Sequence, residues 1–184
     1  MKKIFAILAL GLAGSAFAAD YVSVDIDRVS GLKGAADSTA QYVRAGKGFG
    51  NLQLGLQSRT AQVQGGGLLN SLELTAANNK INVAGITPFV GLGYDNGFNG
   101  GAGKSYEYGL VGATAGAKVG PGFALAGLKT RVGSTEDGPR TKQTVVFGTY
   151  SIPVAKAVAV NLNLSKSYQT IKEDAVGLGL TFAF

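Results

Sequence analysis

The last ten residues of the chain, Ala175 to Phe184, alternate strictly between large apolar and small side chains. The large side chains all share one parity and are Val176, Leu178, Leu180, Phe182 and Phe184. A period of two places them on one face of a β-strand. Domains in water usually end in a polar, frayed tail. A strand with one bulky apolar face that runs to a terminal aromatic residue therefore predicts the closing strand of a β-barrel in lipid. The alternative is an ordinary sheet strand.

The other end of the chain has the pattern of a secretory signal peptide, which we expect to span residues 1–18. Lys2 and Lys3 form a charged start, and an apolar run follows from Ile4 to Leu12. Ala16-Phe17-Ala18 supplies the small residues of a cleavage site. A retained membrane anchor is the weaker alternative, because a spanning helix needs about 20 apolar residues.

Cleavage after Ala18, or as a second choice after Ala19, would leave one exported outer-membrane β-barrel domain over residues 19–184. Removing residues 1–18 lowers the number of Lys plus Arg from 17 to 15 and leaves 11 Asp plus Glu, so the net charge is +4. This excess contains no basic run, and we expect no nucleic-acid partner. Cysteine is absent, so burial or a closed hydrogen-bond network must stabilise the domain instead of disulfides.

Alternating segments separated by turn residues predict an all-β fold, a closed antiparallel transmembrane β-barrel of about ten strands. Short turns near residues 49, 121 and 156 alternate with longer polar loops, as is typical of outer-membrane barrels. Eight strands are the alternative if the weak first and second segments, or the sixth and seventh, are misread; alanine and glycine obscure the faces of the sixth and seventh. The expected ranges are 20–28, 40–47, 52–62, 69–77, 87–95, 106–119, 123–133, 142–153, 158–169 and 175–184.

Three segments resemble hairpins of the Gram-negative general porin family: Phe49 to Gln57, Gly148 to Tyr168 and Gly177 to Phe184. A sixteen-strand porin needs roughly twice as many residues, so in size the chain is similar to the small OmpA-like and OmpW-like outer-membrane barrels. The resemblance implies a location in the cell outer membrane, in contact with its lipid and lipopolysaccharide. It also implies delivery by the barrel-assembly machinery, with a C-terminal assembly signal at Leu180, Phe182 and Phe184. The oligomeric state stays open.

Histidine and cysteine are both absent, which excludes Ser-His-Asp triads, cysteine nucleophiles and histidine-containing zinc or copper sites. Outer-membrane enzymes of similar architecture rely on histidine, so the resemblance implies no enzyme either. Asp25 and Asp27 could act as an acid/base pair, but we favour two inward carboxylates neutralised by basic side chains. We therefore expect no catalytic residue, no metal site and no cofactor.

The polar parity of the strands carries charges of both signs, which we expect to lie inside the barrel and to line a possible pore. Charges on the lipid face would cost up to a few kcal/mol each, and buried charges must be paired. Hairpin pairing predicts that Asp25 lies near Arg44 and that Arg59 lies near Glu73. The full set is Asp25, Asp27, Arg44, Arg59, Glu73, Lys129 and Arg131, with Lys118 added if its strand faces inward.

Two functional hypotheses follow from this composition. Eight-stranded barrels are filled by side chains and sixteen-stranded barrels leave an open channel. A ten-stranded barrel has an intermediate width, which predicts a narrow porin-like channel for small solutes. The alternative is a non-conducting structural or surface-interaction barrel with a plugged, ion-paired interior. A third possibility, a periplasmic barrel that binds a lipid-like ligand, ranks lowest because it needs apolar residues inside.

Overall fold

The computed structural model describes residues 20–30, 38–62, 68–96, 105–135, 141–169 and 173–184. The expected signal peptide over residues 1–18 lies outside the described residues. Within the described part of the chain, no helix has the length and apolar character needed to cross a membrane.

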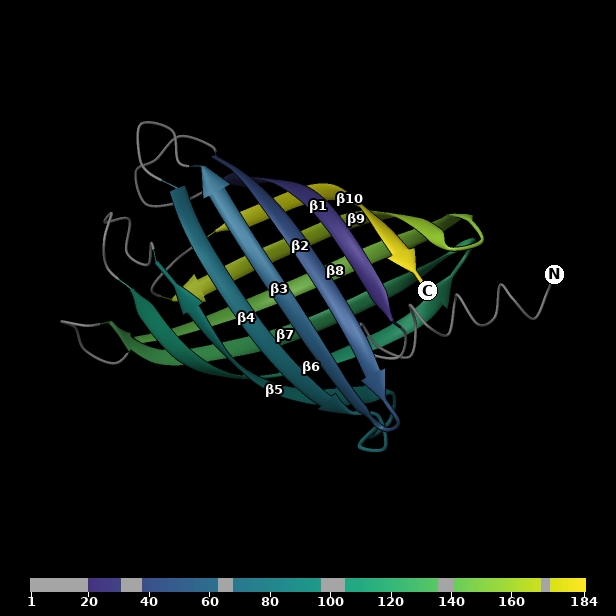
Figure 1. The fold of residues 1–184 in the computed structure, drawn as a ribbon, viewed down its shortest axis with the longest axis horizontal. Coiled ribbons are helices and arrows are strands. Elements are labelled where there is room, and N and C mark those ends of the chain that lie inside the picture. The colour runs from purple at the N-terminus through teal and green to yellow at the C-terminus, as the bar shows by residue number, and fades with distance from the viewer. Residues whose placement is uncertain (1–19, 31–37, 63–67, 97–104, 136–140, 170–172) are drawn as a thin grey trace.

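Ten antiparallel strands form a closed barrel (Figure 1). Each strand pairs with its neighbour in sequence, and β1 pairs with β10 to complete the ring. The ten-strand prediction is confirmed, and the eight-strand alternative is wrong. Three expected ranges match and the others differ by one or two residues at their ends. The strands are β1 (Tyr21–Ser30), β2 (Ser38–Phe49), β3 (Leu52–Gln62), β4 (Leu68–Asn78), β5 (Ile86–Asp95), β6 (Tyr106–Val119), β7 (Gly122–Thr135), β8 (Thr141–Ala155), β9 (Val158–Gln169) and β10 (Asp174–Ala183).

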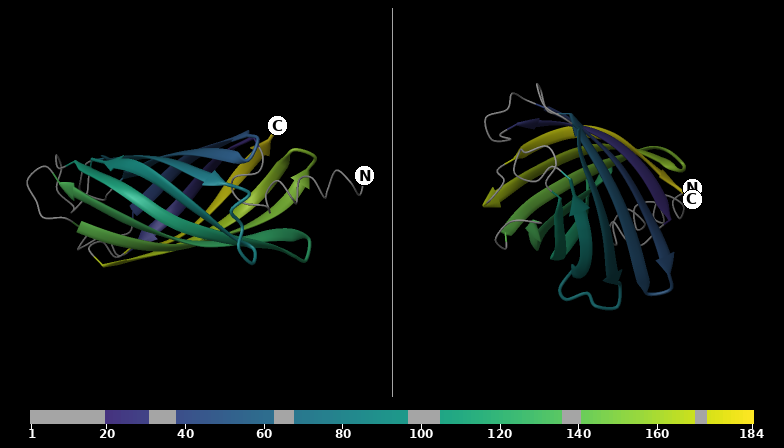
Figure 2. Two further views of the ribbon diagram at one scale, coloured as in Figure 1. Left: turned by 90° about the horizontal axis from the view of Figure 1, so that it is seen from below. Right: turned by 60° about the vertical axis from the view of Figure 1, so that its left-hand side comes forward.

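The closing seam joins β1 to β10 over the whole length of both strands, from Tyr21 opposite Ala183 to Ser30 opposite Asp174. The described chain ends therefore lie side by side, and the amide N–H of Phe184 donates to the carbonyl of Asp20 over 3.1 Å. The two further views in Figure 2 show the strands winding round a common axis at a steep tilt. Strand tilt of this kind is what allows a sheet to close on itself.

Two glycines at hairpin turns adopt the left-handed backbone that side chains disfavour. Gly50, between β2 and β3, has φ 64°, and Gly120, between β6 and β7, has φ 54°. Each allows a tight turn at the end of the barrel where Asp20 and Phe184 lie. The other ends of the strands, such as Ser30 of β1 and Gln62 of β3, lie at the opposite end of the barrel.

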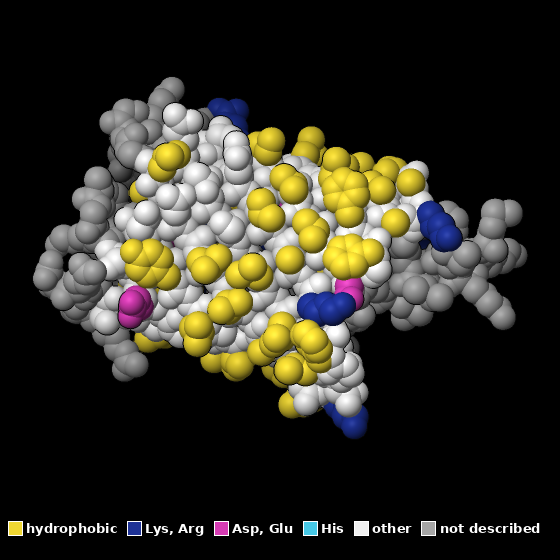
Figure 3. Space-filling view, in the orientation of Figure 1, with side chains coloured by type: hydrophobic (Ala, Val, Ile, Leu, Met, Phe, Trp, Pro, Cys, Tyr) yellow, Lys and Arg dark blue, Asp and Glu magenta, His cyan; other side chains and the backbone are white. Residues whose placement is uncertain are grey.

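The large apolar side chains of the strands point outward, as the alternation predicts. Leu54, Leu74 and Leu162 are 41%, 48% and 42% exposed, so they do not form a central core. Figure 3 shows apolar side chains spread over the barrel surface, with charges near its margins. Such a surface is unfavourable in water and matches the hydrocarbon interior of a bilayer. The fold is that of a small transmembrane β-barrel of the outer-membrane type.

Candidate functional site

The barrel encloses a cavity of about 230 Å³. All seven charged residues predicted to lie inside line this cavity, which shows that β6 and β7 turn their alternate residues inward as the other strands do. Sequence reasoning missed an eighth charged residue, Glu173, which precedes β10. The charged lining consists of Asp25, Asp27, Arg44, Arg59, Glu73, Lys129, Arg131 and Glu173.

Asp25, on β1, carries a carboxylate that forms one ion pair and accepts two further hydrogen bonds in the lumen. Its side chain is 1% exposed and forms an ion pair with Arg44. Asn163 donates to it over 2.7 Å and Ser23 over 3.2 Å. Arg44 also donates from Nε to the side-chain oxygen of Gln57 over 2.9 Å. The predicted contact between Asp25 and Arg44 is therefore confirmed, and both partners keep further hydrogen bonds.

Arg59 pairs with Glu173, with 3.1 Å between Nη2 and the carboxylate oxygen. The predicted pair of Arg59 and Glu73 is wrong. In the β3–β4 register, Ser71 lies opposite Arg59, and Glu73 lies opposite Gln57. The guanidinium reaches instead towards the start of β10, with β1 and β2 lying between the two strands. The ion-pair partner of Arg59 lies across the lumen, just before a strand that is not its hairpin neighbour. Hairpin pairing in the sequence therefore could not predict it.

Glu73, on β4, is the centre of a second network that also crosses the lumen. It forms ion pairs with Lys129 and with Arg131, whose Nη2 lies 2.8 Å away. Tyr108 donates its hydroxyl to Glu73 over 3.3 Å, and Arg131 donates to Gln143 over 2.9 Å. Because β5 and β6 separate β4 from β7, these contacts bridge walls that are not adjacent. One carboxylate thus serves two cations.

Asp27 differs from the other three carboxylates. Its side chain is 4% exposed, and its Oδ1 is enclosed without a hydrogen-bond partner among the described residues. Gly177 lies opposite it in β10, and a Cβ at that glycine would overlap the carboxylate. The inward positions of β10 carry small side chains, and the glycine at position 177 leaves the space that the Asp27 carboxylate occupies.

Uncharged polar side chains join β8, β9 and β10 on the inner face. Ser151 donates to Asn161 over 2.8 Å, and Asn161 donates to Thr181 over 2.7 Å. Thr149 donates to Asn163 over 2.9 Å, which links this series to Asp25. The expected interior of ion pairs and Asn, Gln and Ser hydrogen bonds is present.

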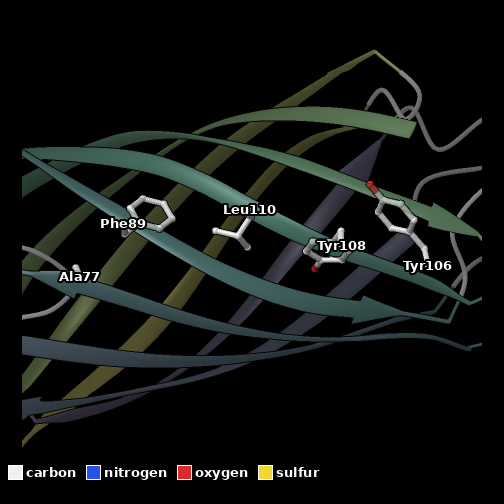
Figure 4. Close-up of a cluster of buried hydrophobic side chains, with 5 residues drawn as sticks. All are labelled: Ala77, Phe89, Tyr106, Tyr108 and Leu110. Atoms are coloured by element: carbon white, nitrogen blue, oxygen red, sulfur yellow. The ribbon is translucent and has the colours of Figure 1, made fainter. Parts of the chain in front are cut away.

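Part of the lumen wall on β5, β7 and β8 is apolar, which sequence reasoning missed. Phe89 and Leu110 belong to a buried cluster in the barrel wall (Figure 4), and Phe147 packs against it. The rings of Phe89 and Phe147 lie against Gly112 and Gly127, where a Cβ would overlap them. Phe89, Phe147, Phe123, Leu125 and Val145 line the cavity. The signal was visible in β5 and β8, where phenylalanine lies on the parity opposite the outward valines.

The remaining candidates lie outside the lumen. Lys118 is exposed near the turn after β6, so it does not join the inner charges. Leu180, Phe182 and Phe184, the proposed assembly signal, are exposed on the outer face of the last strand. Within the described ranges, no cluster of three or more His, Cys, Asp or Glu could hold a metal ion.

A separate ion pair lies at the end of the barrel where the short turns are. Lys47 pairs with Asp20, and the amide N–H of Gly48 donates to Asp20 over 3.0 Å. These two hydrogen bonds hold the pKa of the Asp20 carboxyl below its usual value, and the bond from Lys47 has the larger effect. The pair links Asp20, which precedes β1, to the end of β2.

No family model matches the chain, and no curated protein matches it. Among solved structures, it is similar to Neisserial surface protein A, with 13% identity, a TM-score of 0.46, and coverage of 90% of this chain and 97% of that one. It is also similar to the NanC porin (8% identity, TM-score 0.49, coverage 89% and 100%). A third is the N-terminal β-barrel domain of Pseudomonas aeruginosa OprF (13% identity, TM-score 0.39, coverage 90% and 97%). The architecture assigned above rests on this chain's own strands and surface.

Proposed function

We propose that this protein is a narrow outer-membrane channel that passes water and small solutes through its lumen. The observation that carries the proposal is the cavity of about 230 Å³ inside a closed barrel, lined by eight charged side chains. Charged groups placed inside a membrane protein are costly and usually mark a pathway for ions or solutes. A barrel that only filled space could use apolar side chains instead.

The ion pairs inside the lumen would make this channel narrow. Contacts from β4 to β7 and from β3 to the residue before β10 cross the interior. They divide the space between the walls, so solutes much larger than the cavity would be excluded. The size limit would therefore be set by side chains and not by the backbone ring.

Conductance through a planar lipid bilayer tests the proposal. We expect small single-channel steps from the wild-type barrel, and larger steps from Phe147→Ala because that side chain lines the lumen. Val146→Ala is the matched control, since Val146 is 46% exposed on the outer face of the same strand. Equal steps from wild type and both variants would place the current outside the lumen and contradict the proposal.

A non-conducting barrel is the second candidate, and the crossing ion pairs favour it. If they block the lumen completely, the protein would act as a structural or surface barrel, without transport. The bilayer measurement separates the two functions: no steps from wild type or from Phe147→Ala, in membranes where a known porin conducts, would support the plugged barrel.

We also propose that the protein resides in the cell outer membrane and is inserted there by the barrel-assembly machinery. The apolar outer surface supports contact with membrane lipid and lipopolysaccharide. Phe184 is 79% exposed at the end of the chain, where a partner could reach it before the seam closes. Phe184→Ala should slow the appearance of the folded form in the outer-membrane fraction. Phe49→Ala, an exposed aromatic residue on another strand, is the control.

A further inference from the structure

The charges that line the cavity do not pair one to one. Asp25 is paired with Arg44, and Glu173 with Arg59. Glu73 is shared by Lys129 and Arg131. Asp95 acts electrostatically on Arg131 but does not line the cavity. Among the described residues, Asp27 therefore forms no ion pair, and Lys129 shares its one carboxylate, Glu73, with Arg131.

Asp27 and Lys129 lie on different strands of the lumen wall. Asp27 is on β1 and Lys129 is on β7, with β10, β9 and β8 between them on the shorter way round. Both side chains line the same cavity. A buried charge that is not fully compensated is costly, so Asp27 favours a cationic ligand group, and Lys129, which shares Glu73 with Arg131, favours an anionic one. The lumen thus holds one carboxylate, Asp27, that forms no ion pair among the described residues, and a group of Glu73, Lys129 and Arg131 with a net charge of +1.

An apolar surface adjoins Lys129, which lies opposite Val145 in the β7–β8 register. Phe147 and Val145 belong to β8, one of the strands between β1 and β7, and both line the cavity. Phe147 packs against the cluster of Phe89 and Leu110. Aromatic rings favour contact with other aromatic or apolar groups. A ligand held by the two charges would therefore place its uncharged part against this surface.

We propose that the lumen binds small zwitterionic solutes with an apolar body, such as α-amino acids with apolar side chains. The ammonium group of the solute would face Asp27, its carboxylate would face Lys129, and its side chain would contact Phe147. This inference rests on the proposed function, because it names the class of solute that the channel would select. A solute with only one charge would leave the other surplus charge of the barrel unsatisfied.

Three probes of similar shape test the charge requirement: phenylalanine, 3-phenylpropionate and phenethylammonium. Equilibrium dialysis of radiolabelled probe against the barrel in lipid nanodiscs measures binding, with empty nanodiscs as the blank. We expect phenylalanine to bind at least tenfold more tightly than either singly charged probe. Equal binding of all three probes, or no binding of any, would overturn the inference.

Two variants assign the charges to residues and should both fold. Asp27→Asn removes a carboxylate that forms no ion pair among the described residues, and Lys129→Met leaves Glu73 paired with Arg131. Each should weaken phenylalanine binding at least tenfold. Asp27→Asn should spare 3-phenylpropionate, and Lys129→Met should spare phenethylammonium. Lys156→Gln and Glu107→Gln make the same kinds of charge change at exposed positions and should leave all three affinities unchanged.

The pattern of results separates this inference from the proposed channel. A barrel that conducts ions but binds the three probes equally refutes the inference and leaves the channel standing. A barrel that prefers phenylalanine and shows no conductance supports the inference and contradicts the channel. If Asp27→Asn binds phenylalanine as tightly as wild type does, the assignment to Asp27 is wrong.

Discussion

Neutralising Glu73 should destabilise the barrel more than any other single charge removal in the lumen. The substitution Glu73→Gln preserves the size and shape of the side chain but removes the one anion that Lys129 and Arg131 share. Both cations would then lie next to each other inside the barrel without a carboxylate. Breaking a buried ion pair by removing one partner costs about 3–5 kcal/mol.

The geometry of the site supports this magnitude. At 2.8 Å between Arg131 Nη2 and Glu73, Coulomb's law with an effective dielectric constant of about 20 gives an attraction of about 6 kcal/mol. The side chains are 13% and 5% exposed, so water screens the pair weakly. Relaxation of the freed cations will recover part of this energy, and we expect Glu73→Gln to lower the free energy of unfolding by about 3–5 kcal/mol.

Removing one of the two cations should cost much less. Lys129→Met leaves Glu73 paired with Arg131 and retains most of the apolar stem of the side chain. We expect a loss below about 2 kcal/mol, because no unpaired charge is created. The order of the two variants therefore tests the claim that one carboxylate serves two cations.

Reversible unfolding by urea in lipid vesicles, followed by gel mobility with and without heating, measures these free energies. Glu107→Gln is the control for the loss of a carboxylate, since Glu107 is exposed, and it should be nearly neutral. A loss below about 1 kcal/mol for Glu73→Gln, or a larger loss for Lys129→Met, would refute the reasoning.

Three further predictions concern the wall, the outer surface and the rim. Gly112→Ala would place a Cβ 2.6 Å from the carbonyl oxygen of Leu128 and should cost about 1–3 kcal/mol in urea unfolding. Gly109→Ala in the same strand meets no atom within 4 Å and is its control. Leu178 is 63% exposed on the outer face of β10, and Leu178→Arg should lower the free energy of unfolding by about 2–4 kcal/mol. Leu52→Arg, near a strand end, should lower it by about 0–1 kcal/mol; equal costs would contradict the membrane position. Because the folded-state pKa of Asp20 is lowered, its contribution to stability is present above the unfolded pKa of about 3.9 and is lost as pH falls through the folded value. The stability difference between wild type and Asp20→Asn should therefore be constant above about pH 5 and vanish in acid; a difference that grows on acidification would reverse the sign of this argument.

Strand number and the facing of side chains could be predicted from the sequence because both follow from local alternation. Leu54, Leu74 and Leu162 point outward and Asp25, Asp27 and Arg44 point inward, as the period of two requires. The contact of Asp25 with Arg44 was also accessible, because adjacent strands in a hairpin bring their inward residues together. Residues 106–133 were the exception. Alanine and glycine occupy both alternating sets of positions there, so the sequence does not indicate which side chains face the lumen.

Contacts across the lumen were decided only by the tertiary structure. Arg59 pairs with Glu173, 114 positions away in the chain, and Glu73 pairs with cations on β7, because the tilt and closure of the barrel determine which inward residues share a level. The isolation of Asp27 arises in the same way. Alternation along a strand tells which face a side chain occupies, whereas the partner it meets inside depends on how the whole ring closes.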